Sequence, residues 1–217
     1  MTEETRQNYI KFRHYLKSYI TRDGIDKLIK FLDEQTDFAV APASSKFHGS
    51  YEGGLVQHSL NVFNRIIKQM EAQYTDMSKC PYNKETIALV SLLHDISKVN
   101  VYALSMRNVK DEGGNWVQVP YYSIREDGLL YGTHEENSIF ILENFIKLTY
   151  EEKLAILYHS GGMNSDSEKS IARTMKAFTC PLVSLLHVSD LLATSLDESN
   201  QSALSDASKY SLTEEES

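Results

Sequence analysis

Six side chains of the kinds that bind divalent transition metals lie on or beside apolar, helix-like segments of the sequence. They are His58, the adjacent pair His94 and Asp95, His134, His159 and Asp190. Burying several such groups together without a cation would leave polar atoms hard to satisfy, and neutral imidazole with carboxylate suits a transition metal. A lone His-Asp pair is a weak signal, and a single histidine on an apolar face is more often a core residue. The six together predict a metal site.

Hydrophobic periodicity indicates that mainly α-helices must position these side chains. Helices are expected over about 9–20, 25–32, 55–70, 85–98, 134–148, 149–159 and 171–178, and from 181 onwards, with a loop over 37–52. Thr149 and Glu152 match a capping box, and Pro181 suits the first turn of the last helix. The six polar residues fall on five of these helices. We therefore predict a helical bundle that gathers them at one place.

Between Val99 and Gly132 the pattern changes from helix to strand. Two runs rich in β-branched and aromatic residues flank the turn at 110–114, which predicts a β-hairpin inserted at about 99–124. Its residues Trp116, Tyr121 and Tyr122 could stack on a base, form a dimer contact or pack the hairpin onto the helices. We expect N-terminal helices over 1–41, a main domain over 42–195 and an acidic, flexible tail over 196–217.

Charge and composition narrow the classes of partner. The net charge is −8, and six acids against Lys209 give residues 195–217 a net charge of −5. Long nucleic acid, which usually meets a basic stripe, is therefore not expected, whereas a small phosphorylated substrate could be held through a bound cation. The polar N-terminus is unlike a secretory signal, and the apolar stretches are too short for a membrane span. With Cys80 and Cys180 expected as reduced thiols, these features predict a cytoplasmic protein.

The segments around the six residues resemble the HD superfamily of metal-dependent phosphohydrolases, in the order found in that family. They read GGLVQHSLNVF, LVSLLHDISK, YGTHEENSIFI, ILYHSGG and LLHVSDLLAT. The resemblance covers roughly residues 42–194 and implies an all-α HD-domain bundle, here with an inserted hairpin. The loop PASSKFHGSYEGGL is similar to the HD module of bacterial 3′-5′ exoribonucleases. There it accompanies an OB domain, for which the 41 helix-like residues before Pro42 leave no room.

The resemblance also implies roles for individual residues. His58, His94, Asp95 and Asp190 would bind a first metal ion. In binuclear branches of the superfamily, Asp95 would bridge to a second ion held by His134 and His159. In mononuclear branches those two histidines would instead contact the phosphate. Nitrogen donors favour Mn, Fe, Co, Ni or Zn over calcium, with Mg as an alternative.

Three further residues have open roles at this stage. Lys98 follows His94 by one helical turn and either binds the phosphate of a substrate or is an ordinary helix-end lysine. His48 either reaches the site or is a turn residue. His187, three residues before Asp190, is expected to pack, with support of a metal ligand as the alternative.

The sequence predicts an enzyme that hydrolyses a phosphomonoester or phosphodiester of a nucleotide or short oligonucleotide. The motif typical of cyclic di-GMP phosphodiesterases is absent around His134 and His159. The competing hypothesis is a regulatory module that binds metal and nucleotide without turnover. A structural helical protein would leave the six polar residues unexplained. Homo-oligomerisation stays open.

Overall fold

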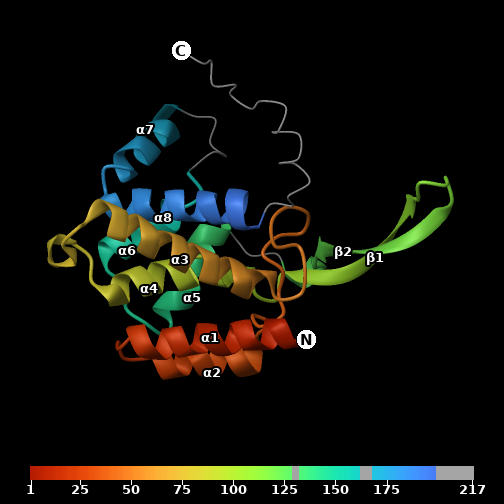
Figure 1. Cartoon of the computed structure of the whole chain (residues 1–217), viewed down its shortest axis with the longest axis horizontal. Coiled ribbons are helices and arrows are strands. Elements are labelled where there is room, and N and C mark those ends of the chain that lie inside the picture. The colour runs from red at the N-terminus through yellow and green to blue at the C-terminus, as the bar shows by residue number, and fades with distance from the viewer. Residues whose placement is uncertain (129–131, 162–167, 199–217) are drawn as a thin grey trace, which may run out of the picture.

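The computed structural model describes residues 1–128, 132–161 and 168–198, and Figure 1 shows their arrangement. Its elements are α1 (Glu3–Tyr19), α2 (Ile25–Gln35), α3 (Gly54–Gln73), α4 (Lys84–Leu93), β1 (Tyr102–Lys110), β2 (Trp116–Ile124), α5 (His134–Glu143), α6 (Tyr150–Tyr158), α7 (Glu168–Ala177) and α8 (Pro181–Leu192). The prediction of a mainly α-helical fold with one inserted hairpin is confirmed.

Local signals explain where several helices begin. The capping box predicted at Thr149 and Glu152 starts α6, and a second box at Thr133 and Glu136 starts α5. Pro181 occupies the first turn of α8. In each box the side chains satisfy backbone N–H groups that have no partner inside the helix.

Two helices end earlier than the periodicity predicts. The helix expected over 85–98 stops at Leu93, and a 3₁₀ turn follows at Ile96–Lys98. The helix expected over 134–148 stops at Glu143, whose carboxylate accepts a hydrogen bond from the backbone N–H of Leu148. Apolar spacing continues through both breaks because the residues after them are still buried, so the hydrophobic pattern hides the ends of the helices.

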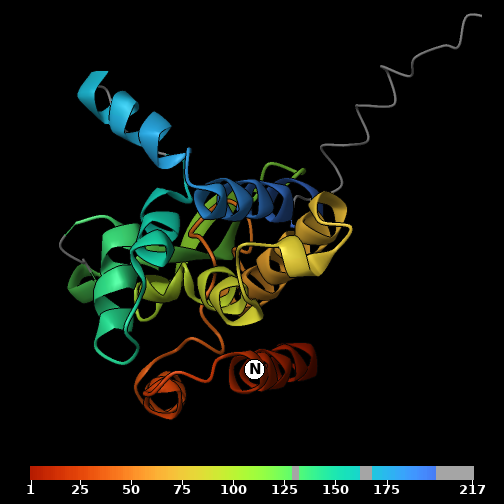
Figure 2. The ribbon, with the colours of Figure 1, turned by 90° about the vertical axis from the view of Figure 1, so that its left-hand side faces the viewer.

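The hydrophobic core lies where α3, α4, α6 and α8 meet. Every residue of α4 from Ile87 to Leu93 is buried, so this helix runs through the centre of the bundle. Helices α1 and α2 lie side by side and form a layer along one flank, as Figures 1 and 2 both show. Phe12 of this layer lies 4.7 Å from Phe38, measured between ring centroids, and α1 contacts α3 and α4.

The hairpin leaves this body as a two-stranded antiparallel ribbon (Figure 1). Its register runs from the pair Tyr102 and Ile124 to the pair Lys110 and Trp116. Trp116 is 69% exposed, and its ring lies 5.3 Å from the ammonium of Lys110. Of the three possibilities for Trp116, packing of the hairpin onto the helices is therefore wrong, because the ribbon carries this residue away from the bundle.

The C-terminal end of α8 continues into a π-helix over Ala193–Asp197. Glu198 follows it, and residues 199–217 of the predicted acidic tail lie outside the described residues. Within the described part of the chain, no single helix has the length and apolar character to cross a membrane. Ser170–Ala177 and Pro181–Asp197 meet those criteria only as a pair bent by 98°.

A buried ion pair ties the N-terminal layer to the bundle. The guanidinium of Arg22 donates hydrogen bonds to both carboxylate oxygens of Glu152, at 2.7 and 2.6 Å, and it also contacts Glu85. The side chain of Glu152 is fully buried. Burial opposes ionisation of Glu152, but the hydrogen bonds from Arg22 prevail and hold the pKa of this carboxyl below its usual range. Removing the arginine would leave a buried charge without a partner.

We therefore expect Arg22→Met to lower the free energy of unfolding by about 3 kcal/mol at pH 7. The folded-state pKa of Glu152 is depressed, so its contribution is present at neutral pH and is lost as the pH falls through about 4 and below. The difference in free energy of unfolding between wild type and Arg22→Met should therefore become smaller as the pH is lowered. Urea unfolding between pH 3 and 7 measures both effects.

Arg6→Met is the matched control, because Arg6 pairs with Glu3 on the surface, where both side chains are more than half exposed. It should change the free energy of unfolding by less than about 1 kcal/mol. Equal losses for the two variants would contradict the role given to Arg22.

Candidate metal centre

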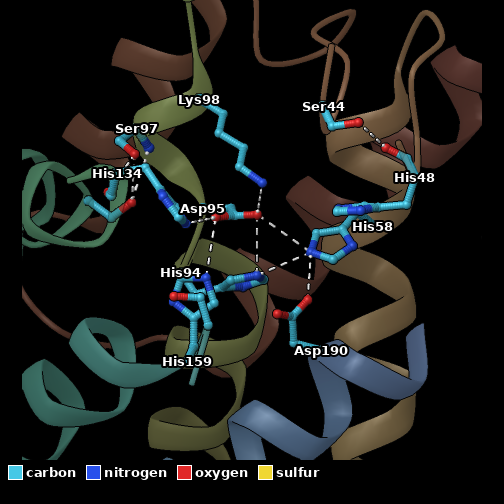
Figure 3. A network of polar contacts seen from close by, with 12 residues as sticks. Ser44, His48, His58, His94, Asp95, Ser97, Lys98, His134, His159 and Asp190 are labelled. Atoms are coloured by element: carbon cyan, nitrogen blue, oxygen red, sulfur yellow. Dashed lines mark hydrogen bonds and ion pairs between the residues drawn. The ribbon is translucent and has the colours of Figure 1, made fainter. Parts of the chain in front are cut away.

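The fold brings all six predicted residues together around Asp95 (Figure 3). They come from separate elements: His58 from α3, His94 and Asp95 from the end of α4, His134 from the start of α5, His159 from the end of α6 and Asp190 from α8. The early end of α4 contributes directly, because it lets Asp95 turn into the centre of the group.

Asp95 presents each carboxylate oxygen to a different pair of histidines. Its Oδ2 lies 3.5 Å from the Nε2 atoms of both His58 and His94. Its Oδ1 lies 3.6 Å from the Nε2 atoms of both His134 and His159. Oδ1 is buried and has no hydrogen-bond partner among the described residues. Such an atom carries a free-energy penalty unless a cation or donor reaches it.

The opposite nitrogen of each histidine is anchored by an oxygen acceptor. The Nδ1–H groups of His94 and His159 donate to the backbone carbonyls of Ser91 and Ile156, at 3.0 and 2.7 Å. Nδ1 of His58 lies 3.0 Å from a carboxylate oxygen of Glu198.

The fourth histidine follows the same pattern, since Nδ1 of His134 lies 3.2 Å from the carboxylate of Glu135. With a proton held on Nδ1, a neutral imidazole offers its Nε2 lone pair as a ligand. Four Nε2 atoms therefore point at Asp95 as potential donors to a metal.

Burial and neighbouring charges have opposite effects on the pKa values of these histidines and acids: burial disfavours the charged form, and an opposite charge nearby favours it. Burial disfavours the charged form of His58, but hydrogen bonds to Asp190 and Glu198 outweigh it and raise the pKa of His58 to about 10. Burial lowers the pKa of His94 to about 3. Burial also opposes ionisation of Asp95, but Lys98 and His94 hold the pKa of this carboxyl well below its usual range. Asp95 therefore stays ionised at the centre of the group, and a cation bound beside it would displace the Nε2 proton of His58.

The spacing of the side chains fits metal coordination. Nε2 of His58 lies 3.2 Å from both Nε2 of His94 and an oxygen of Asp190. Ligands bound at about 2.1 Å lie about 3.0–3.4 Å apart in octahedral or tetrahedral geometry. The His58, His94 and Asp95 group and the Asp95, His134 and His159 group could each hold an ion. The residues present fit a divalent metal.

The side chain of Lys98 points into the same centre, although, contrary to the prediction from sequence, Lys98 does not lie on the same helix as His94. It lies on the 3₁₀ turn after α4, and its ammonium is 2.7 Å from Oδ2 of Asp95. Burial opposes its charge, yet Asp95 raises the pKa of Lys98 above its usual value. Lys98 is thus a helix-end residue that supplies a positive charge beside the central carboxylate, and its phosphate-binding role stays a prediction.

Supporting residues emerge that sequence reasoning missed or left open. Glu198, assigned to the flexible tail, is buried against His58 and also accepts a hydrogen bond from Asn61. Glu135 supports His134 and accepts a hydrogen bond from the hydroxyl of Ser160. The adjacency of Glu135 to His134 was visible in the sequence, whereas nothing local connects Glu198 with His58.

His187 and His48 lie just outside the six. His187 packs edge-on against Phe178, as expected, and its Nδ1 lies 2.6 Å from the backbone carbonyl of His159. The ring centroids of His48 and His58 lie 5.0 Å apart. Nε2 of His48 is buried and has no hydrogen-bond partner among the described residues. His48 therefore reaches the site. His14 is exposed on α1.

The loop that carries His48 is held against α3 by close backbone contact. The backbone N–H of Ala43 donates to the carbonyl of Gly49, and a Cβ on Gly54 would lie 1.9 Å from that same oxygen. Only glycine permits this approach.

Comparison with curated proteins finds one similar to part of the chain. The dihydroneopterin 2′,3′-cyclic phosphate phosphodiesterase of Methanocaldococcus jannaschii is 33% identical over 96 residues, which are 44% of this chain and 35% of that protein. The matched stretch thus spans about a third of the relative's length. No family model and no solved structure matches the chain. The chain is similar, over less than half its length, to a phosphodiesterase.

The contact at Gly54 generates a prediction about the loop. Gly54→Ala should lower the free energy of unfolding by about 1–3 kcal/mol, because backbone must move to make room for the methyl group. Gly113→Ala is the control: its Cβ would meet only flexible side chains in the exposed hairpin turn. The control should lose less than about 0.5 kcal/mol in urea unfolding. Equal stability of both variants would contradict the close contact.

Proposed function

We propose that this chain is a metal-dependent phosphohydrolase of the HD type that cleaves phosphoesters of nucleotides or short oligonucleotides. The observation that carries the proposal is the set of four Nε2 atoms arranged around both oxygens of a single buried carboxylate, Asp95. Two imidazoles on each oxygen form a pattern that suits a carboxylate bridging two cations. We also propose residues 42–195 as the catalytic domain.

In this proposal, two ions share Asp95. His58, His94 and Asp190 would complete one site, and His134 and His159 the other. The mononuclear alternative would have both histidines of the second site contact phosphate. His159 is only 2% exposed, which favours it as a metal ligand, whereas His134 is 38% exposed and more accessible to a substrate.

Bound divalent ions would neutralise phosphoryl oxygens and lower the pKa of the attacking water. The chain's own residues would then bind and orient the ester. Lys98 is placed to exchange its contact with Asp95 for one with a phosphoryl oxygen. Glu198, Ser91 and Ile156 would hold the imidazoles in the orientation that keeps their Nε2 atoms inward.

The similarity to a cyclic phosphate phosphodiesterase supports a phosphodiester as the bond that is cleaved. The net charge of −8 favours small substrates over long nucleic acid. We therefore propose phosphodiesters, including nucleoside cyclic phosphates, ahead of phosphomonoesters as substrates.

The central test combines metal content with turnover. Wild type should bind Mn²⁺ and hydrolyse bis(p-nitrophenyl) phosphate or a nucleoside 2′,3′-cyclic phosphate, and chelation should abolish turnover. Because His94 and Asp95 would be direct ligands, His94→Ala and Asp95→Asn should each lower metal affinity and turnover at least about a hundredfold. Elemental analysis, calorimetry and product assays measure these losses.

His14→Ala provides the matched control, since His14 is exposed on α1 and should leave both properties unchanged. Full turnover in Asp95→Asn would refute the proposal. Binding of metal and nucleotide by wild type, with no turnover across several metals, would instead identify a regulatory module.

A separate prediction concerns Glu198, which holds Nδ1 of His58 and is not itself one of the proposed metal ligands. Glu198→Ala should weaken Mn²⁺ binding about 10- to 100-fold, and Glu198→Gln should lose less because the amide oxygen still accepts from Nδ1–H. Asp127→Ala is the control, as Asp127 pairs with Arg125 on the surface. Calorimetric titration with Mn²⁺ measures the affinities. Equal affinities for Glu198→Ala and Asp127→Ala would contradict this role.

A further inference from the structure

A pocket of about 480 Å³ lies between the loop that carries His48 and the ribbon of β1 and β2. Small-molecule sites commonly have volumes of about 300–1,000 Å³. Ser45, Lys46, Ser50 and Tyr51 line it from the loop, and residues including Arg107, Tyr121 and Tyr122 line it from the ribbon.

The pocket is positively charged in a chain of net charge −8. Lys46 and Arg107 line it, no acidic residue does, and neither cation forms an ion pair within the part of the chain that is described. Both side chains are exposed. Two exposed cations on facing walls, neither with an acidic partner among the described residues, suit the oxygens of a phosphate.

Aromatic rings accompany these cations. Tyr51 is 51% exposed, Tyr121 and Tyr122 are half-buried, and the guanidinium of Arg107 lies 5.5 Å from the ring of Tyr121. Tyrosine rings stack on nucleobases with little regard to base identity, and a guanidinium adds to that stacking. The combination fits a base and its adjoining phosphate.

Both walls of the pocket continue to the metal centre. On the loop, Lys46 lies two residues before His48, whose ring faces His58 (Figure 3). On the ribbon, Leu104 lies two residues after Tyr102, which in turn follows Lys98 by four residues. The pocket and the metal centre therefore share the loop that carries Lys46 and His48.

We infer that this pocket binds the nucleotide next to the cleaved phosphodiester, so that the preferred substrate is a short single-stranded oligonucleotide. The inference rests on the proposed function for the place of cleavage. The pocket itself is argued from Lys46, Arg107 and the tyrosines. Stacking explains why the site would accept different bases, and the two cations explain why it would require a phosphate.

Equilibrium binding tests the pocket apart from catalysis. Calorimetry with full-length protein in EDTA would compare a thymidine trinucleotide with an abasic trinucleotide that carries the same phosphates. Wild type should bind the thymidine form more tightly. Arg107→Ala and Tyr121→Ala should each weaken that binding about tenfold, and Tyr121→Phe should restore it because the ring is kept.

The hairpin supplies a matched control pair. Lys110 and Trp116 form the same kind of contact between a cation and a ring, on the same ribbon but outside the pocket. Lys110→Ala and Trp116→Ala should therefore leave binding unchanged. Circular dichroism checks that every variant keeps its fold.

The outcomes separate the two proposals. Equal binding of both trinucleotides by wild type, or unchanged binding in Arg107→Ala and Tyr121→Ala, would overturn the pocket assignment. A lower molar mass of Tyr121→Ala in light scattering would overturn it too, by making this face a contact between copies. If the expected binding pattern appears but no diester is hydrolysed with added Mn²⁺, the proposed function fails while the pocket assignment stands.

Discussion

The structure depends on a carboxylate placed in the middle of a helical bundle. Asp95 is 2% exposed, and its two oxygens face four imidazole nitrogens and one ammonium. A buried negative charge needs compensation, and here it comes from Lys98 on one oxygen while the other has no donor. The first turns of α3 and α5 and the last turns of α4, α6 and α8 all contribute to this one place, so the arrangement of the bundle and the requirements of Asp95 are coupled.

The surroundings of Asp95 are held from outside by a second set of contacts. Backbone carbonyls at the ends of α4 and α6 fix His94 and His159, and the segment after α8 brings Glu198 to His58. These carbonyls are available because a helix leaves its last C=O groups without partners inside the helix. Ending a helix at a ligand thus serves two purposes: it frees an acceptor and it turns the side chain inward.

The N-terminal layer and the hairpin extend the bundle in different ways. Arg22 connects the layer of α1 and α2 to α6 through its ion pair with the buried Glu152. Apolar residues of α1 and α2 belong to the same hydrophobic core as the bundle. The ribbon of β1 and β2 instead leaves the core (Figure 1), and together with the loop of His48 it lines a pocket. Rigid helices therefore surround the centre, while a loop and a ribbon form the surface beside it.

The sequence alone determined the fold class, the inserted hairpin, the capping box at Thr149 and the six residues that meet at Asp95. These follow from local periodicity and side-chain chemistry, which need no tertiary contacts to be read. Only the tertiary structure decided that α4 ends before His94, that Lys98 pairs with Asp95, that Trp116 is exposed and that Glu198 reaches His58 across 140 residues of sequence. The physical reason is that hydrophobic spacing reports burial, not helix ends, and no local pattern records which distant group satisfies a buried charge.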